Sequence, residues 1–274
     1  MASVTARIQQ IKQPLGGYIK PSEFKETIFD DGKTLEEENL HPTIIGMAVD
    51  YLTRFMCNQQ SGMKQEDNAN TSFIISLHGY MVRIKLLGDA YYRKDVRDKV
   101  DTTFLLKQVQ GLDDKSIVAA CKLVTYDVWY RNPMAAITSK GAGETMPDNK
   151  TIENIRIMVE RGLTFWKQYG PVVKDGFTFE KDGYTAVVDT GDGDFLTADT
   201  MWDFKVSKSK PTNKHTLQLL MYWIMGKHSK KPEFKNITKL GIFNPRLNTV
   251  YCFDIANVSQ EIIQEIEKEV ICYK

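Results

Sequence analysis

The sequence GDGDFLTADTMWDFKVSKSK occupies residues 191–210. Its second half alternates polar and apolar side chains, and this two-residue period is typical of a β-strand. Asp203 and Lys205 then share one face of the strand. Trp202 and Phe204 share the other face, which we expect to pack on the core. A carboxylate and an ammonium group are therefore predicted side by side on the polar face of a sheet.

A second carboxylate, Asp194, precedes Asp203 by nine residues. Carboxylate oxygens are the ligands that Mg²⁺ and Mn²⁺ prefer, and a bound ion neutralises phosphate charge and activates a water molecule. A lysine beside them can support the nucleophile and the charge of the transition state. These groups together predict phosphodiester hydrolysis. The alternative interpretation is that Asp203 and Lys205 form a simple surface ion pair.

Three motifs follow one another in this region: Gly191-Asp192-Gly193-Asp194, then Asp203-Phe204-Lys205, then Gln218-Leu219-Leu220-Met221-Tyr222. Their order resembles the PD-(D/E)XK nucleases, and in particular the RecB-like branch. In that branch a G-x-x-D turn enters a strand, a hairpin follows, the next strand ends in (D/E)-x-K, and a helix with Q-x-x-x-Y comes after it. Residues four apart on a helix share one face, so the glutamine and tyrosine can both turn toward the same place.

The resemblance implies a role for each of these residues. Asp194 and Asp203 would hold Mg²⁺ or Mn²⁺, and Lys205 would assist the attacking water. Gln218 and Tyr222 would orient the scissile strand. The expected activity is that of a metal-dependent deoxyribonuclease. The motifs leave open whether the enzyme cuts from an end or internally, and whether it attacks DNA or RNA.

The RecB-like branch also has an upstream helix with a G-x-x-(H/E) motif whose last residue contributes to the metal site. Residues 46–50, GMAVD, resemble that helix, with Asp50 as a candidate metal ligand. An aspartate here departs from the pattern of the branch. Glu153 and Glu160, on a predicted helix just before the strands, are the competing candidates for completing the metal site.

A run of lysines follows the predicted strand. Nine lysines and one acid, Glu233, lie between Lys205 and Lys239, although the whole chain has a formal net charge of only +1. Such a run is a candidate surface for binding the phosphates of DNA, single- or double-stranded. The residues proposed to contact nucleic acid are Lys208, Lys210, Lys214 and His215. The alternative is a solvated lysine face that keeps the protein soluble.

Periodicity along the chain predicts an α/β fold, with a central mixed sheet flanked by helices and a largely helical N-terminal region or insertion. Helices are expected at 41–55, 114–129, 151–169, 216–226 and 259–270, and strands at 73–87, 176–179, 184–188, 195–206, 238–243 and 249–255. The resemblance divides the chain into a loop-rich segment 1–40, a first core helix 41–60, an insertion 61–150 and a restriction-endonuclease-like core 151–274.

Other classes of protein find little support in the sequence. The longest apolar run, residues 219–225, is too short to span a bilayer, and the N-terminus lacks the apolar stretch of a secretory signal. We therefore expect a cytoplasmic protein with no membrane partner. Iron–sulfur members of the RecB-like branch carry four clustered cysteines, whereas the four cysteines here are scattered, so no iron–sulfur cluster is expected.

A different functional class stays open beside the nuclease. A nuclease-like fold can bind nucleic acid or a partner protein without cutting, because a fold does not by itself establish an activity. If the chain does cut, the resemblance makes DNA repair, phage or mobile-element biology and defence the expected settings.

Overall fold

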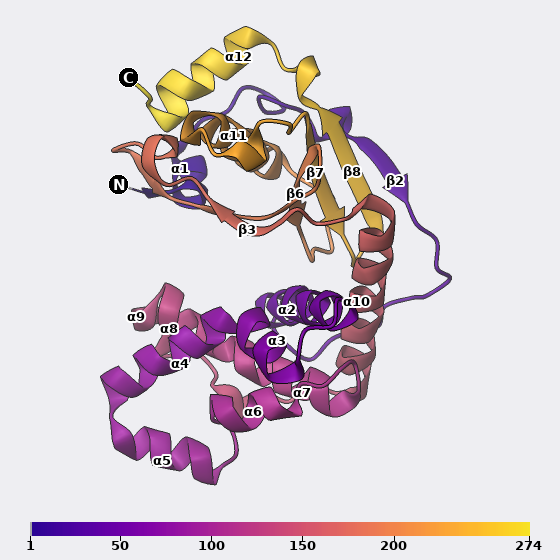
Figure 1. Cartoon of the computed structure of the whole chain (residues 1–274), viewed down its shortest axis with the longest axis vertical. Helices are drawn as coiled ribbons and strands as arrows, with labels where there is room; N and C mark the ends of the chain where they lie inside the picture. The colour runs from indigo at the N-terminus through magenta and orange to yellow at the C-terminus, as the bar shows by residue number, and fades with distance from the viewer. Residues whose placement is uncertain (1) are drawn as a thin grey trace. The chain divides into compact units, whose positions relative to one another are not determined.

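The structure, a computed structural model, describes residues 2–274. The chain forms two compact units. The first consists of the N-terminal residues as far as Asp30 together with Phe165–Lys274, and the second is Asp31–Thr164. We call the first the α/β unit, because it contains a six-stranded mixed sheet with helices packed on it, and the second the helical unit (Figure 1). The predicted α/β class with a helical N-terminal region is confirmed.

The sheet of the α/β unit has one parallel pair of strands among antiparallel ones. Its strands lie in the order β2 (Lys25–Ile28), β8 (Thr249–Asp254), β7 (Lys239–Asn244), β6 (Thr200–Phe204), β5 (Asp192–Leu196) and β3 (Lys174–Thr178). Only β6 and β7 run parallel. Parallel neighbours need a crossover, and here it contains α11 (Asn213–Ser229). The predicted hairpin within 195–206 and the strands at 238–243 and 249–255 are confirmed.

One face of the sheet is covered by the end of α10 (Asn149–Tyr169). Phe165 on this helix stacks on Phe243 of β7, with ring centroids 4.3 Å apart. It also contacts the edge of Trp202, at a centroid distance of 4.8 Å. Trp202 and Phe204 belong to this aromatic cluster, so the predicted core face of the strand is confirmed.

The opposite face of the sheet, which carries Asp203, is also buried. Three helical segments pack there: α1 (Val4–Gln10), α11, and α12 (Gln260–Glu265) with the π-helical turn Ile266–Ile271 that follows it. Figure 1 shows α1, α11 and α12 gathered on one side of the strands. The expectation of an open polar face was wrong. A strand covered on both faces is typical of sheets with a crossover helix.

Residues 1–40 contain more structure than their turn-rich sequence predicts. Ala2–Ser3 (β1) pairs in parallel with Val188–Thr190 (β4). The edge strand β2, with the sequence KETI, pairs with β8. A short polar edge strand has no apolar period, so its partner more than 200 residues away cannot be inferred locally. The strand expected at 184–188 begins only at Val188.

The helical unit consists of short helices around α2 (Pro42–Gln60). They are α3 (Gln65–Ser72), α4 (Ile74–Leu87), α5 (Asp89–Arg97), α6 (Thr102–Gln108), α7 (Asp114–Leu123), α8 (Asp127–Arg131) and α9 (Pro133–Ala136), with 3-10 turns at Val124–Tyr126 (η2) and Ala142–Glu144 (η3). The expected strand at 73–87 is therefore wrong. That run is apolar on nearly every side, so it lacks a helical period, although its length favours a helix.

The compact units do not follow the predicted divisions. Helix α2, expected to be the first helix of the nuclease core, packs with α3 and α7 inside the helical unit. The α/β unit begins again at Phe165 and also includes the N-terminal residues. Across residues 2–274, no helix combines the length and apolar character needed to cross a membrane.

Gly241 makes the packing of the aromatic face testable. A Cβ at this position would lie 2.3 Å from Cε3 of Trp202, whereas a Cβ at Gly111 would meet nothing within 4 Å. We expect Gly241→Ala to lower the free energy of unfolding by about 1–3 kcal/mol, because the buried indole must shift. A urea titration followed by circular dichroism measures this change. Gly111→Ala serves as the control, and an equal loss in both variants would contradict the packing argument.

Candidate functional site

The hairpin formed by β5 and β6 brings Asp194 and Asp203 together. Its antiparallel register pairs Phe195 with Trp202 and Leu196 with Met201. Continued by one residue, this register sets Asp194 opposite Asp203 on the same face, where opposing Cβ atoms lie roughly 4.5–5.5 Å apart. Oδ2 of Asp194 accepts a 2.7 Å hydrogen bond from the backbone N–H of residue 204, directly after Asp203. The sequence-predicted carboxylates therefore converge.

Lys205 lies beside Asp203, as the strand period predicts. Its Nζ is 3.0 Å from Oδ1 of Asp203, and its backbone N–H donates to the carbonyl of Phe243. The Asp203 residue is only 5% exposed. Its second oxygen, Oδ2, is buried and has no hydrogen-bond partner within residues 2–274.

Within the described part of the α/β unit, three buried side-chain polar atoms have no hydrogen-bond partner: Oε1 of Gln13, the Tyr251 hydroxyl and Oδ2 of Asp203, of which the last belongs to a carboxylate. A buried acceptor without a donor costs about 1–3 kcal/mol, and more when the group is charged, so native proteins seldom leave one unsatisfied. A carboxylate can only accept, and its missing partner must be a donor or a cation. Oδ2 of Asp203 is therefore the atom where a ligand is expected.

Helix α11 presents Gln218 and Tyr222 to the same region. Nε2 of Gln218 donates to the Tyr222 hydroxyl at 2.9 Å, which confirms that the two share one helical face. Burial raises the pKa of Tyr222 well above its ordinary value. The negative charges of three carboxylates, Asp203, Asp194 and Asp192, add to that rise. The phenol thus lies within electrostatic reach of the acidic group.

The burial of Tyr222 bears on its expected role. The residue is only 4% exposed and packs within the core cluster under α11. A side chain so enclosed is better placed to hold the carboxylates than to touch a nucleic-acid strand directly.

His215 begins α11 close to the ion pair. Its Nδ1 accepts a hydrogen bond of 3.1 Å from the backbone N–H of Thr212, which caps the helix. Burial lowers the pKa of His215 below its usual value, the charge of Lys205 lowers it further, and Asp203 opposes the shift. This lowered pKa disfavours the charged imidazole, whose Nε2 can donate while Nδ1 accepts.

The lysine run is less positive than its sequence suggests. Four of its members are neutralised by acids from other segments: Lys210 by Glu26, Lys230 by Asp182, Lys231 by Glu180 and Lys239 by Asp199. Lys208 and Lys214 are exposed, and neither forms an ion pair with an acidic side chain among the described residues 2–274. Lys208 follows β6 and Lys214 lies in the first turn of α11, so both flank the acidic group in sequence.

The candidates for a third metal ligand lie in the helical unit. Asp50 on α2 pairs with Arg54 at 2.9 Å, and Glu160 pairs with Lys33. Glu153 forms an ion pair with Arg156. Each carboxylate thus has a cation partner within its own unit, and a metal-binding role for any of them stays a prediction.

The sequence does not reveal the residues that hold Gly191, which lies between β4 and β5; the turn that the resemblance implies at residues 191–194 is instead the start of strand β5. The Tyr184 hydroxyl donates to the carbonyl of Gly191 at 2.6 Å and accepts from the backbone N–H of Phe179. Val4 lies against Gly191, so close that a Cβ there would be 2.8 Å from its side chain. Neither contact has a motif in the sequence, because both come from segments outside the nuclease-like pattern.

No group of three or more His, Cys, Asp or Glu side chains arranged to hold a metal occurs in the part of the chain that the structure describes. Comparisons with protein-family models, with curated proteins and with solved structures find no match. The geometry of the hairpin and of α11 is consequently what indicates a function for this chain.

Asp194 gives a test of how the hairpin is held. Asp194→Ala removes the acceptor of a partly buried N–H, so we expect the free energy of unfolding to fall by about 1–3 kcal/mol. Asp194→Asn keeps an oxygen in the same place and should cost clearly less. Both are measured by urea titration. Equal losses from the two substitutions would show that the hydrogen bond to residue 204 does not position this carboxylate.

Proposed function

We propose that the α/β unit is a divalent-metal-dependent nuclease that hydrolyses phosphodiester bonds of DNA. The observation that carries the proposal is the buried, unpartnered Oδ2 of Asp203, on a strand that also carries Lys205 and pairs with the strand of Asp194. This arrangement accompanies the three motifs of the RecB-like pattern, in their expected order along β5, β6 and α11.

The residues present fit a small hard cation. Mg²⁺ is usually held by one or two carboxylates, with water and substrate phosphate completing its coordination. Asp203 and Asp194 supply such a pair, so a cluster of three protein ligands is not required. When bound, the ion would supply charge neutralisation at the phosphate and a more acidic water.

The chain's own residues have distinct roles in this proposal. The Lys205 side chain is 30% exposed and adjoins Asp203, so its ammonium group can reach both a phosphate oxygen and the attacking water. Gln218 and Tyr222 are positioning residues in this proposal: the amide fixes the phenol, which lies within electrostatic reach of the carboxylates. Lys208 and Lys214 are exposed cations for the DNA backbone.

The second candidate is a nuclease-like module that binds without cutting. Four lysines of the run are neutralised by distant acids, which reduces the positive charge available to a polyanion. Within this second candidate, the ion pairs favour a partner protein over nucleic acid. The intact carboxylate and lysine group favours the nuclease, since binding alone does not need a buried unpartnered carboxylate oxygen. A cytoplasmic location and a role in repair, phage or mobile-element biology or defence belong to the nuclease proposal.

Lys205 tests the proposal directly. We expect Lys205→Ala to reduce cleavage by roughly 10²–10³-fold or more, because a charge that stabilises the transition state is lost. Affinity for DNA should change only about two-fold, since one phosphate contact of several is removed. The assay is a digestion panel of linear, circular, single-stranded and RNA substrates with Mg²⁺ or Mn²⁺.

Two further variants keep this test interpretable. Lys205→Met retains the apolar stem, so it separates the loss of the charge from the loss of side-chain packing. Lys268→Ala is the matched control, because this exposed lysine of the turn Ile266–Ile271 has no role in the proposal, and cleavage by it should stay close to that of the unaltered protein. Turnover retained in both Lys205 variants would refute the assigned role, and absence of cleavage by the unaltered protein on every substrate would favour the binding module.

A further inference from the structure

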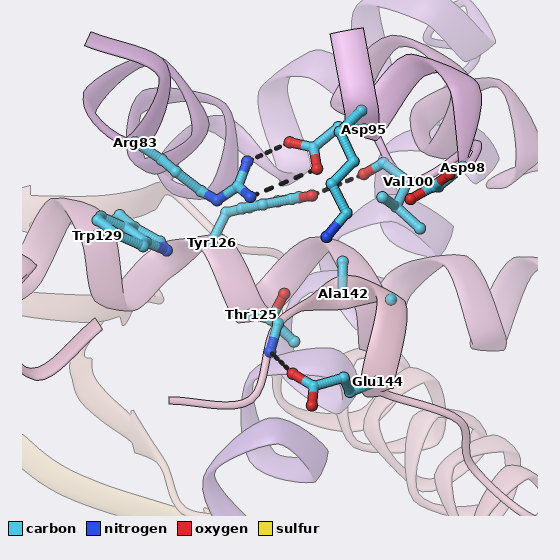
Figure 2. A pocket seen from close by; sticks show the side chains of 12 residues that line it. Arg83, Asp95, Asp98, Val100, Thr125, Tyr126, Trp129, Ala142 and Glu144 are labelled. Carbon is cyan, nitrogen blue, oxygen red and sulfur yellow. Dashed lines mark hydrogen bonds and ion pairs between the residues drawn. The ribbon is translucent and has the colours of Figure 1, made fainter. Parts of the chain in front are cut away.

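The corner between α4 and α5 in the helical unit is organised around one guanidinium. Arg83 on α4 forms an ion pair with Asp95 of α5. Its Cζ lies 5.5, 5.8 and 6.0 Å from the ring centroids of Tyr91, Tyr126 and Trp129. Figure 2 shows the guanidinium directed at the Asp95 carboxylate, with the rings of Tyr126 and Trp129 beside it. These contacts dock α5 onto the rest of the unit.

A cavity of about 340 Å³ opens beside this cluster. Its size lies within the roughly 300–1,000 Å³ of small-molecule sites. The rings of Tyr126 and Trp129 form part of its walls. The other lining residues include Lys94, Asp98, Thr125 and Glu144. The pocket offers carboxylates that accept from amino groups and an ammonium for an anion, while Tyr126 and Trp129, only 3% and 8% exposed, form its apolar wall.

The surface of α5 outside the cavity also carries exposed aromatic and basic side chains. Tyr91 and Tyr92 are 43% and 49% exposed, although tyrosines usually bury their rings. Residues 83–99 carry six basic and three acidic side chains, an excess of three positive charges. Two of the acids, Asp95 and Asp98, are already paired with arginines of the same segment.

Two cations of α5 are available to a ligand. Arg93 and Lys94 are exposed, and among residues 2–274 no acidic side chain forms an ion pair with either. They come directly after Tyr91 and Tyr92, so one turn of the helix presents two aromatic and two basic side chains.

We propose that this corner, formed by Tyr91–Lys94 and the adjoining cavity, binds single-stranded nucleic acid. Bases of a single strand expose their faces and can stack on tyrosine, while the cations contact the phosphates. A duplex hides its base faces, and it should bind less well. The cavity beside Lys94 would take one nucleobase. The inference does not depend on the nuclease proposal, because binding here requires neither the hairpin carboxylates nor a metal.

The test is the affinity of the full chain for a fluorescent single-stranded oligonucleotide, measured by anisotropy. An oligonucleotide of about 20 nucleotides spans more than one stacking site. EDTA is present throughout, so no cleavage interferes. We expect Tyr92→Ser combined with Lys94→Glu to weaken binding about 10-fold or more, because a stacking platform and a phosphate contact are lost together.

The matched control makes the same two changes on other helices of the unit. Tyr130→Ser combined with Lys115→Glu removes an exposed tyrosine, 51% accessible on α8, and an exposed lysine on α7. Binding by this variant should stay within about two-fold of the unaltered protein, since only long-range charge is lost. Tyr92→Ser alone, which leaves every charge in place, should still weaken binding.

Three results would overturn the inference. Equal weakening by the control pair would show only non-specific attraction to positive charge, and a duplex bound as tightly as the single strand would exclude stacking. Binding to phosphatidylserine vesicles without binding to the oligonucleotide would make the corner a membrane surface instead. Because the assay contains EDTA, failure of the nuclease proposal would leave all of these results unchanged.

Discussion

The α/β unit depends on the placement of one carboxylate inside a covered sheet. Asp203 is nearly buried, pairs with Lys205 through one oxygen, and leaves the other without a partner in the described chain. Removing one partner of a buried ion pair usually costs several kcal/mol, because the remaining charge is left buried and uncompensated. The position of Asp203 is therefore expected to be fixed by the elements packed around it. These elements are the β5–β6 hairpin, α11 and the N-terminal helix α1.

The surroundings are built from both ends of the chain. Aromatic rings from α10 fix Trp202 on one face of β6, and strand alternation then directs Asp203 to the other face. On that face α11 brings Tyr222 within electrostatic reach of the carboxylates, while Val4 and Tyr184 contact Gly191 between β4 and β5. The geometry of the site is thus a consequence of core packing. Substitutions far from the carboxylates are consequently expected to disturb them.

The local parts of this arrangement could be predicted from sequence. The period of residues 200–204 predicted β6 and the contact of Asp203 with Lys205, and the i, i+4 spacing predicted that Gln218 and Tyr222 share a face. Interactions between distant segments could not be predicted. The acids that neutralise Lys210, Lys230, Lys231 and Lys239 lie outside the lysine run, and the burial of Asp203 depends on helices that no strand pattern reveals. Residues 73–87 were misassigned because an apolar run without period does not distinguish a buried strand from a helix.

The central claim is that Asp203 and Asp194 form a site for a divalent cation, and crystals soaked in millimolar Mn²⁺ test it most directly. Anomalous scattering from manganese identifies the ion without reference to activity. The account predicts one strong peak in contact with Oδ2 of Asp203 and with the carboxylate of Asp194. The absence of a peak there, with the ion pair between Asp203 and Lys205 intact, would contradict it.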